Sequence, residues 1–121
     1  MLLVAGLAAV VPPSSALGQS ANKQLARGKA VYAARCAECH GLQGEGKKGP
    51  KLMGPEHNLS GYATAEGLYT YTRQVMPANR PGRLLEPDYW AVLAYILNEN
   101  GLLPAGTILG RDNATQVALD R

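Results

Sequence analysis

The sequence contains no phenylalanine and a single tryptophan among 121 residues, so its side chains alone supply little large aromatic filler for a core. Two cysteines are too few for a scaffold held by disulfide bonds. A net charge of +3, with no basic run interleaved with aromatics, does not argue for nucleic-acid binding. With 46% hydrophobic and 17% charged residues, the composition excludes general disorder. The length suits one small domain, which a cofactor or cross-link would help to stabilise.

An apolar segment at the N-terminus fits an export signal. Residues 2–11 read LLVAGLAAVV, and this run is too short to span a bilayer as a helix. Small residues up to Gly18 offer a cleavage site, with an uncleaved N-terminal anchor as the alternative. We expect residues 1–18 to be a signal peptide, 19–101 the folded domain and 102–121 a C-terminal extension packed on it. The mature protein would be periplasmic or otherwise exported, with no stable membrane span.

The spacing of apolar residues predicts an all-α fold with about three main helices. No alternating pattern in the sequence is long enough for a convincing strand. The first helix is expected over residues 22–39, with Asn22 as its N-cap and Leu25, Gly28 and Tyr32 on one face. Glycine inside a helix costs ~1 kcal/mol relative to alanine. Gly28 therefore indicates that another backbone crosses close to it.

Two further helices follow a glycine-rich loop over residues 41–61. Thr64 is expected to cap a helix over 65–75, which ends where a proline follows. The third helix is expected over 87–100, with proline at its start and glycine beyond its end. It is apolar nearly all round and must be buried on more than one side. A short helix over 113–119 is also expected in the tail.

One short motif carries the candidate chemistry. Residues 36–40 read Cys-Ala-Glu-Cys-His, the spacing used for the attachment of c-type haem. Positions i, i+3 and i+4 of a helix share one face, so Cys36 and Cys39 can form thioethers with the two vinyl groups at one haem edge. His40 then faces the iron from the same side as an axial ligand. We expect one covalently attached haem c, which would also supply the large apolar body that the side chains lack.

Three other interpretations of this motif are weaker. A thioredoxin-like dithiol would need a βαβ context, which the sequence does not contain. A zinc site would need a fourth ligand, and His57 is badly spaced for that role. A disulfide bond across two intervening residues is strained and rare.

The second axial ligand has several candidates. Met76 precedes Pro77 at the end of the second predicted helix, far enough beyond His40 to reach the opposite face of a haem. Met53 follows His40 closely in the glycine-rich loop, where loop packing is the plainer interpretation. His57 or an open iron position completes the set, although a solvated surface histidine is the plainer interpretation of His57.

Over residues 25–101 the sequence resembles the class I cytochrome c family. The segments that carry the resemblance are Cys36 to Gly41, Gly28 with Tyr32, Gly49 to Leu52, Met76-Pro77 and Trp90 to Ile96. More loosely, the stretches after Tyr69 and Asp88 look like small bacterial cytochromes that serve periplasmic dehydrogenases. The resemblance implies the cytochrome c fold and places the methionine ligand at Met76.

The resemblance also implies roles for residues around the haem. The carbonyl oxygen of Pro50 would accept the Nδ1–H of His40, which leaves Nε2 for the iron. The first and last helices would cross in close contact. The remaining candidate haem contacts are Leu93 and Leu97 in the pocket and Arg73 at a propionate, with Tyr62, Tyr71, Arg80 and Trp90 as alternatives at the propionates.

A His/Met-ligated haem has no vacant iron position, so the expected function is transfer of single electrons with no catalytic residue. The expected partners are redox proteins, namely a dehydrogenase as donor and an oxidase or another cytochrome as acceptor. Residues 23–51 carry seven basic and two acidic side chains, which suits an acidic docking surface, although a solvated surface fits equally. The alternative function is a haem protein with an open or labile sixth site, acting as a peroxidase-like enzyme or a small-ligand binder.

Overall fold

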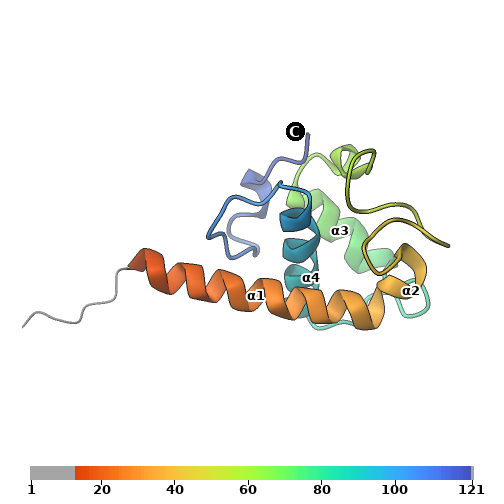
Figure 1. The fold of residues 1–121 in the computed structure, drawn as a ribbon, viewed down its shortest axis with the longest axis horizontal. Coiled ribbons are helices and arrows are strands. Elements are labelled where there is room, and N and C mark those ends of the chain that lie inside the picture. The colour runs from red at the N-terminus through yellow and green to blue at the C-terminus, as the bar shows by residue number, and fades with distance from the viewer. Residues whose placement is uncertain (1–12, 121) are drawn as a thin grey trace, which may run out of the picture.

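The described part of the chain is built from helices, as the sequence predicts (Figure 1). The computed structural model describes the backbone of residues 13–120 and the side chains of residues 18–120. Its elements, in chain order, are α1 Pro13–Arg35, α2 Ala37–His40, η2 Leu59–Tyr62, α3 Ala65–Val75, α4 Glu86–Glu99 and η3 Ala114–Gln116, where η marks a short 3₁₀ turn. No helix in this part of the chain is long and apolar enough to cross a membrane.

Helices α1 and α4 cross in close contact at Gly28. A side-chain carbon on this residue would overlap the backbone carbonyl group of Ala91 and would press on the Cβ atom of Tyr95. Next to the crossing, the rings of Tyr32 and Tyr95 pack with their centroids 5.7 Å apart. The predicted crossing of the first and last helices is therefore present, and glycine is required where the two backbones approach.

Helix α1 differs from the predicted first helix at both ends. It begins at Pro13, so Asn22 lies inside the helix and the predicted N-cap is wrong. Proline is well tolerated in the first turn of a helix, and the small residues that follow it continue the helix without an apolar stripe. A turn at Cys36 ends α1 and separates it from α2.

The predicted signal peptide lies largely outside the described structure. Residues 1–12 fall outside the described residues, and the predicted cleavage site after Gly18 falls within α1. The division into residues 1–18, 19–101 and 102–121 stays a prediction.

Helices α3 and α4 lie within one residue of their predicted bounds. The hydroxyl oxygen of Thr64 accepts a hydrogen bond from the amide of Gly67 at 3.2 Å and caps α3. Pro87 lies in the first turn of α4, and Gly101 follows the helix with a φ angle of 70°. Most of α4 is buried, as its apolar residues on all sides predict; its buried residues are Tyr89, Trp90, Ala91, Val92, Leu93, Ala94, Ile96 and Leu97.

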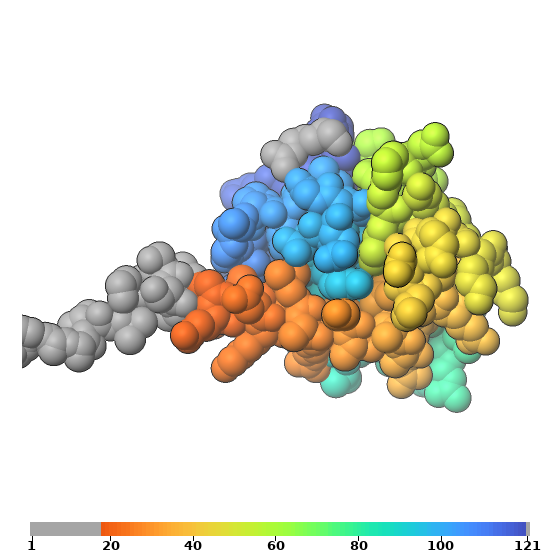
Figure 2. Space-filling view, in the orientation of Figure 1, coloured from red at the N-terminus to blue at the C-terminus, as the bar shows by residue number. Residues whose placement is uncertain are grey.

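The residues after α4 fold back over α1 (Figures 1 and 2). In the space-filling view, the blue C-terminal segment lies over the first half of the orange helix, and the yellow loop after α2 lies at its other end. The side chain of Gln24 in α1 donates a hydrogen bond to the carbonyl oxygen of Leu109 at 2.9 Å and accepts one from its amide at 2.8 Å. This pair of bonds fixes the segment on α1.

The end of the chain pairs with the start of α3 rather than forming the predicted helix over 113–119. Only the turn η3 is helical there, so this prediction was mostly wrong. The residues that follow are extended, and Thr64 and Ala118 form an isolated antiparallel bridge. The amide of Ala65 donates to the carbonyl oxygen of Val117 at 2.9 Å. Pairing with a distant backbone segment therefore replaces local helical bonds.

Candidate haem site

The Cys-Ala-Glu-Cys-His motif forms a tight turn at the junction of α1 and α2. The amides of Cys39 and His40 both donate hydrogen bonds to the carbonyl oxygen of Cys36, at 3.2 and 3.0 Å. Both cysteines are free thiols and are half-buried. Burial, and to a smaller extent the neighbouring Cys39, raises the pKa of the Cys36 thiol to about 11, which keeps this thiol protonated at neutral pH.

The ring of His40 is oriented by the loop that follows it. Its Nδ1 atom lies 2.8 Å from the carbonyl oxygen of Pro50. Because a carbonyl oxygen only accepts hydrogen bonds, Nδ1 carries a proton in this contact, and Nε2 is the ring nitrogen left for a metal. A neutral imidazole with a free Nε2 atom is the form that binds a metal. His40 and Pro50, which the resemblance pairs, are therefore in contact in the structure.

The glycine-rich loop is tied back to the motif along its length. The amide of Gly46 donates to the carbonyl oxygen of His40 at 2.7 Å, and the amide of Gly49 donates to that of Cys39 at 2.6 Å. A side-chain carbon on Gly49 would press on the imidazole ring of His40. Glycine at this position therefore allows the loop backbone to pass directly beside the ring.

Asn100, at the end of α4, fixes the far part of this loop. Its side-chain amide donates a hydrogen bond to the carbonyl oxygen of Leu52 at 2.8 Å. Its side-chain oxygen accepts one from the amide of Gly54, also at 2.8 Å. The loop that carries Pro50 is thereby joined to the helix that crosses α1. Sequence reasoning missed this role, because an asparagine followed by glycine is already accounted for as a signal that the helix ends.

Tyr32 joins α1 to the end of α2. Its hydroxyl group donates a hydrogen bond to the carbonyl oxygen of Gly41 at 2.7 Å, and its side chain is buried. Burial, followed by the Cys36 thiol, raises the pKa of Tyr32 to about 12. The sequence places Tyr32 on the buried face of its helix, and the contact of its hydroxyl group becomes apparent only in the folded chain.

Met76 is the half-buried residue that ends α3. Its amide donates to the carbonyl oxygen of Thr72 at 2.8 Å, which completes the last turn of the helix. Its own carbonyl oxygen accepts a hydrogen bond from the hydroxyl group of Tyr89 at 2.7 Å and one from the amide of Gly82 at 3.3 Å. The backbone of Met76 is therefore held by groups from α3, from α4 and from the loop between them.

The two other candidate ligands lie in the loop that follows His40. Met53 is buried in the hydrophobic core, and a side-chain carbon on Gly44 would overlap it. The Nδ1 atom of His57 accepts a hydrogen bond from the amide of Leu59 at 3.2 Å. Among the described side chains, no group of three His, Cys, Asp or Glu is placed to hold a metal ion, so the zinc interpretation gains no support.

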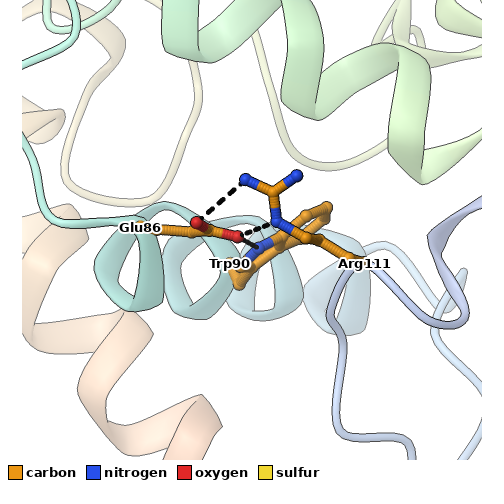
Figure 3. A network of polar contacts seen from close by, with 3 residues as sticks. All are labelled: Glu86, Trp90 and Arg111. Carbon is orange, nitrogen blue, oxygen red and sulfur yellow. Dashed lines mark hydrogen bonds and ion pairs between the residues drawn. The ribbon is translucent and has the colours of Figure 1, made fainter.

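Trp90 is held by contacts with Glu86 and Tyr69. Its indole N–H donates a hydrogen bond to Glu86 Oε2 at 3.0 Å, and Arg111 pairs with the same carboxylate at 2.5 Å (Figure 3). Its ring stacks on that of Tyr69, with centroids 3.8 Å apart. The hydrogen bond to Glu86 uses the only donor of the indole, and a propionate role for Trp90 stays a prediction.

The other predicted contacts differ in how much protein covers them. Leu93 and Leu97 are 1% and 0% exposed and belong to the core, so a haem-lining role stays a prediction. Arg73 is exposed in the last turn of α3 and also stays a prediction for a propionate. At the possible alternatives Tyr62 and Tyr71, the two rings pack 5.0 Å apart.

The fold and the motif together define a c-type cytochrome domain: a small all-α domain with two free thiols and an oriented histidine in one turn. Residues 23–96 match the family described as "Cytochrome C oxidase, cbb3-type, subunit III", and the chain belongs to this family of cytochrome c domains. The cytochrome c fold is thereby confirmed. The chain thus contains a cytochrome c domain, and it is similar to two dehydrogenases.

Two relatives illustrate this relationship. The chain is 31% identical to the thiosulfate dehydrogenase of Stutzerimonas stutzeri (strain A1501) over 80 residues, which cover 60% of this chain and 26% of that protein. This chain thus spans about a quarter of the length of that curated relative. The crystal structure of the sulfane dehydrogenase SoxCD from Paracoccus pantotrophus matches with a TM-score of 0.66 and 26% identity, over 94% of this chain and 68% of the matched chain.

Proposed function

We propose that this chain is a periplasmic monohaem cytochrome c that passes single electrons, either as a free carrier or as a subunit of a dehydrogenase. Cys36 and Cys39 would form the two thioether bonds, and His40 and Met76 would be the axial ligands. The observation that carries the proposal is the hydrogen bond between His40 and Pro50, because it leaves Nε2 as a free metal ligand beside two free thiols.

The donor set fits haem c. The thiols, the imidazole and a thioether are the groups that hold this cofactor in cytochromes with His/Met ligation. When bound, haem c supplies a one-electron Fe(III)/Fe(II) couple. The protein's part is to hold the two axial side chains in fixed positions. His40 is oriented by Pro50, and Met76 is anchored through its backbone.

Ligation by Met76 favours electron transfer over catalysis. A thioether sulfur is a soft ligand that stabilises the ferrous state and raises the reduction potential. With both axial positions taken by side chains, no position remains for a substrate at the metal. Met53 is the weaker ligand candidate because it is packed in the core beside Gly44, in the loop that also orients His40.

The proposed location and redox partners rest on the sequence and on its similarity to known proteins. Similarity to a thiosulfate dehydrogenase and to the sulfane dehydrogenase SoxCD supports a dehydrogenase as electron donor. The apolar run over residues 2–11 supports export to the periplasm. The excess of basic side chains over residues 23–51 supports an acidic docking surface on the partner.

Substitution of each methionine in the mature holoprotein tests this assignment. Met76→Ala should lower the reduction potential and let the ferrous protein bind carbon monoxide, whereas Met53→Ala and the wild type should not bind it. A fully matured wild-type sample that is colourless would refute the haem assignment. A wild-type sample that binds carbon monoxide readily would instead favour the open-site alternative.

A further inference from the structure

Tyr89, in the first turns of α4, meets both ends of the loop that begins at Met76. Its side chain is 0% exposed. Its hydroxyl group donates a hydrogen bond of 2.7 Å to the carbonyl oxygen of Met76 and accepts one of 3.4 Å from the amide of Leu84. A phenol hydroxyl has one donor and can accept at its oxygen, so both capacities are used here. One buried hydroxyl group therefore spans the loop over residues 76–84.

Leu84 packs against the core at the end of this loop, and little else fastens its middle. Residues 78–83 are all exposed, so their side chains contribute little buried contact. The bonds within the loop are short-range, such as that from the amide of Arg80 to the carbonyl oxygen of Pro77 at 2.8 Å. Local bonds of this kind shape a turn without fixing it against the rest of the protein. The long-range fastening of the Met76 backbone is thus the Tyr89 hydroxyl group.

The ring of Tyr89 is itself held rigidly. It packs edge-on against the ring of Tyr69, with centroids 6.3 Å apart and an interplanar angle of 83°. Tyr69 in turn stacks on Trp90. A donor carried on a packed ring loses little side-chain entropy when it forms its hydrogen bond, because packing has already restricted its rotamer. Tyr89 is therefore suited to fix the position of a neighbouring loop.

We propose that Tyr89 is a positioning residue for the sixth iron ligand, and that its hydroxyl group controls how readily Met76 leaves the iron. This inference rests on the proposed function, in which Met76 is that ligand. Tyr89 acts only through the backbone carbonyl of Met76. When this bond is lost, the loop can swing outward and carry the thioether with it. Local opening of a loop with few buried contacts requires only a small part of the global unfolding energy.

The test compares imidazole binding by the ferric holoproteins of the wild type, Tyr89→Phe and Tyr95→Phe. The Tyr89 variant removes the hydroxyl group and keeps the ring. We expect about tenfold tighter and faster imidazole binding, equal to ~1.4 kcal/mol, the size of one buried hydrogen bond. The weak long-wavelength absorption band that marks sulfur–iron ligation should fade at lower imidazole concentration. Tyr95 is the matched control, since it lies on the same helix and its ring packs on Tyr32 rather than near the loop.

The possible outcomes separate this inference from the proposed function. Wild-type protein without the sulfur band, and with ready imidazole uptake, would mean that Met76 is not the ligand. A wild type with the band, and a Tyr89→Phe variant that binds imidazole like the wild type, would overturn the positioning role alone. An equal gain in Tyr95→Phe would also overturn it, because the effect would then be a general loosening of α4.

A second measurement applies if Tyr89→Phe does not mature. Hydrogen exchange at the amide of Leu84 is followed in the wild-type holoprotein with and without saturating imidazole. If the hydrogen bonds of Tyr89 break when Met76 leaves the iron, displacement of Met76 should accelerate this exchange about tenfold. This is the factor expected for one broken buried hydrogen bond. An unchanged exchange rate would show that the loop stays fastened when the ligand leaves, and would refute the proposal.

Discussion

The side chain of Asn100 joins the last turn of α4 to the loop beside His40, through hydrogen bonds of 2.8 Å to both Leu52 and Gly54. This relationship links two parts of the chain that are far apart in the sequence. The loop in question carries Pro50, whose carbonyl oxygen fixes the tautomer of His40. The orientation of the proposed axial histidine therefore depends on a residue that does not touch it.

Asn100→Ala should free this loop without removing any proposed haem ligand. The substitution leaves the carbonyl of Leu52 and the amide of Gly54 without their partner, at a cost of ~1–3 kcal/mol in the free energy of unfolding. Hydrogen exchange at Gly54 and at the Nδ1 proton of His40, followed by NMR in the holoprotein, should become faster. Asn98→Ala, at an exposed position of the same helix, is the control and should change neither rate. Equal exchange in the two variants would show that the loop is held by its own backbone bonds.

Gly28→Ala should separate α1 from α4. The added methyl group would overlap the carbonyl group of Ala91, and backbone atoms cannot rotate aside as a long side chain can. Overpacking of this kind costs typically ~1–3 kcal/mol. Denaturant unfolding of the holoprotein measures the loss. Gly61→Ala, where the new methyl group meets open space, should stay close to the wild type, and a similar loss in both variants would contradict the close-crossing explanation.

Tyr32→Phe should change how stability depends on alkaline pH. Burial raises the pKa of Tyr32 in the folded protein to about 12, against an ordinary value of 10.0. The unfolded chain thus releases this proton first, so the stabilisation is complete below pH ~10 and is lost as the pH rises towards ~12. The variant lacks this titration, so its unfolding free energy should fall less steeply over that interval. It should also be lower at neutral pH by ~1 kcal/mol, since the carbonyl of Gly41 loses its donor.

Denaturant unfolding at several pH values checks this prediction. Tyr71→Phe is a suitable control because Tyr71 is exposed on α3, and its curve should follow that of the wild type. If the Tyr32→Phe and wild-type curves run parallel from pH ~10 upward, Tyr32 does not carry the alkaline loss of stability.

The elements with local signals could be predicted from the sequence. Thr64 marks the start of α3 through a side-chain hydrogen bond to a residue three positions along the chain, and Pro87 marks the start of α4. Gly28 indicated the helix crossing because glycine destabilises a helix, and a close approach of another backbone explains its presence there. The haem-attachment motif is likewise contained within a single turn of helix. Each of these signals acts over a few residues and therefore leaves a readable local pattern.

The parts that could not be predicted depend on contacts between distant segments. The early start of α1 at Pro13 escaped notice because the following small residues form no apolar stripe and paired prolines suggest a break. The extended pairing of Ala118 with Thr64 replaced a predicted helix because its partner segment lies far away in the sequence. The anchoring roles of Tyr89 and Asn100 reach loops that lie elsewhere in the chain, so no local spacing reveals them.

Tyr89 and Asn100 stand at opposite ends of α4, and each secures a loop that carries or orients one proposed axial side chain. An α-helix turns by about 100° per residue, and Tyr89 and Asn100 are separated by about three full turns. The two residues therefore lie on nearly the same side of the helix. Inserting or deleting a single residue between them would rotate one anchor away from its loop while leaving the other in place. The length of α4 is therefore constrained, and changes in chain length within it should disrupt one side of the proposed haem site selectively.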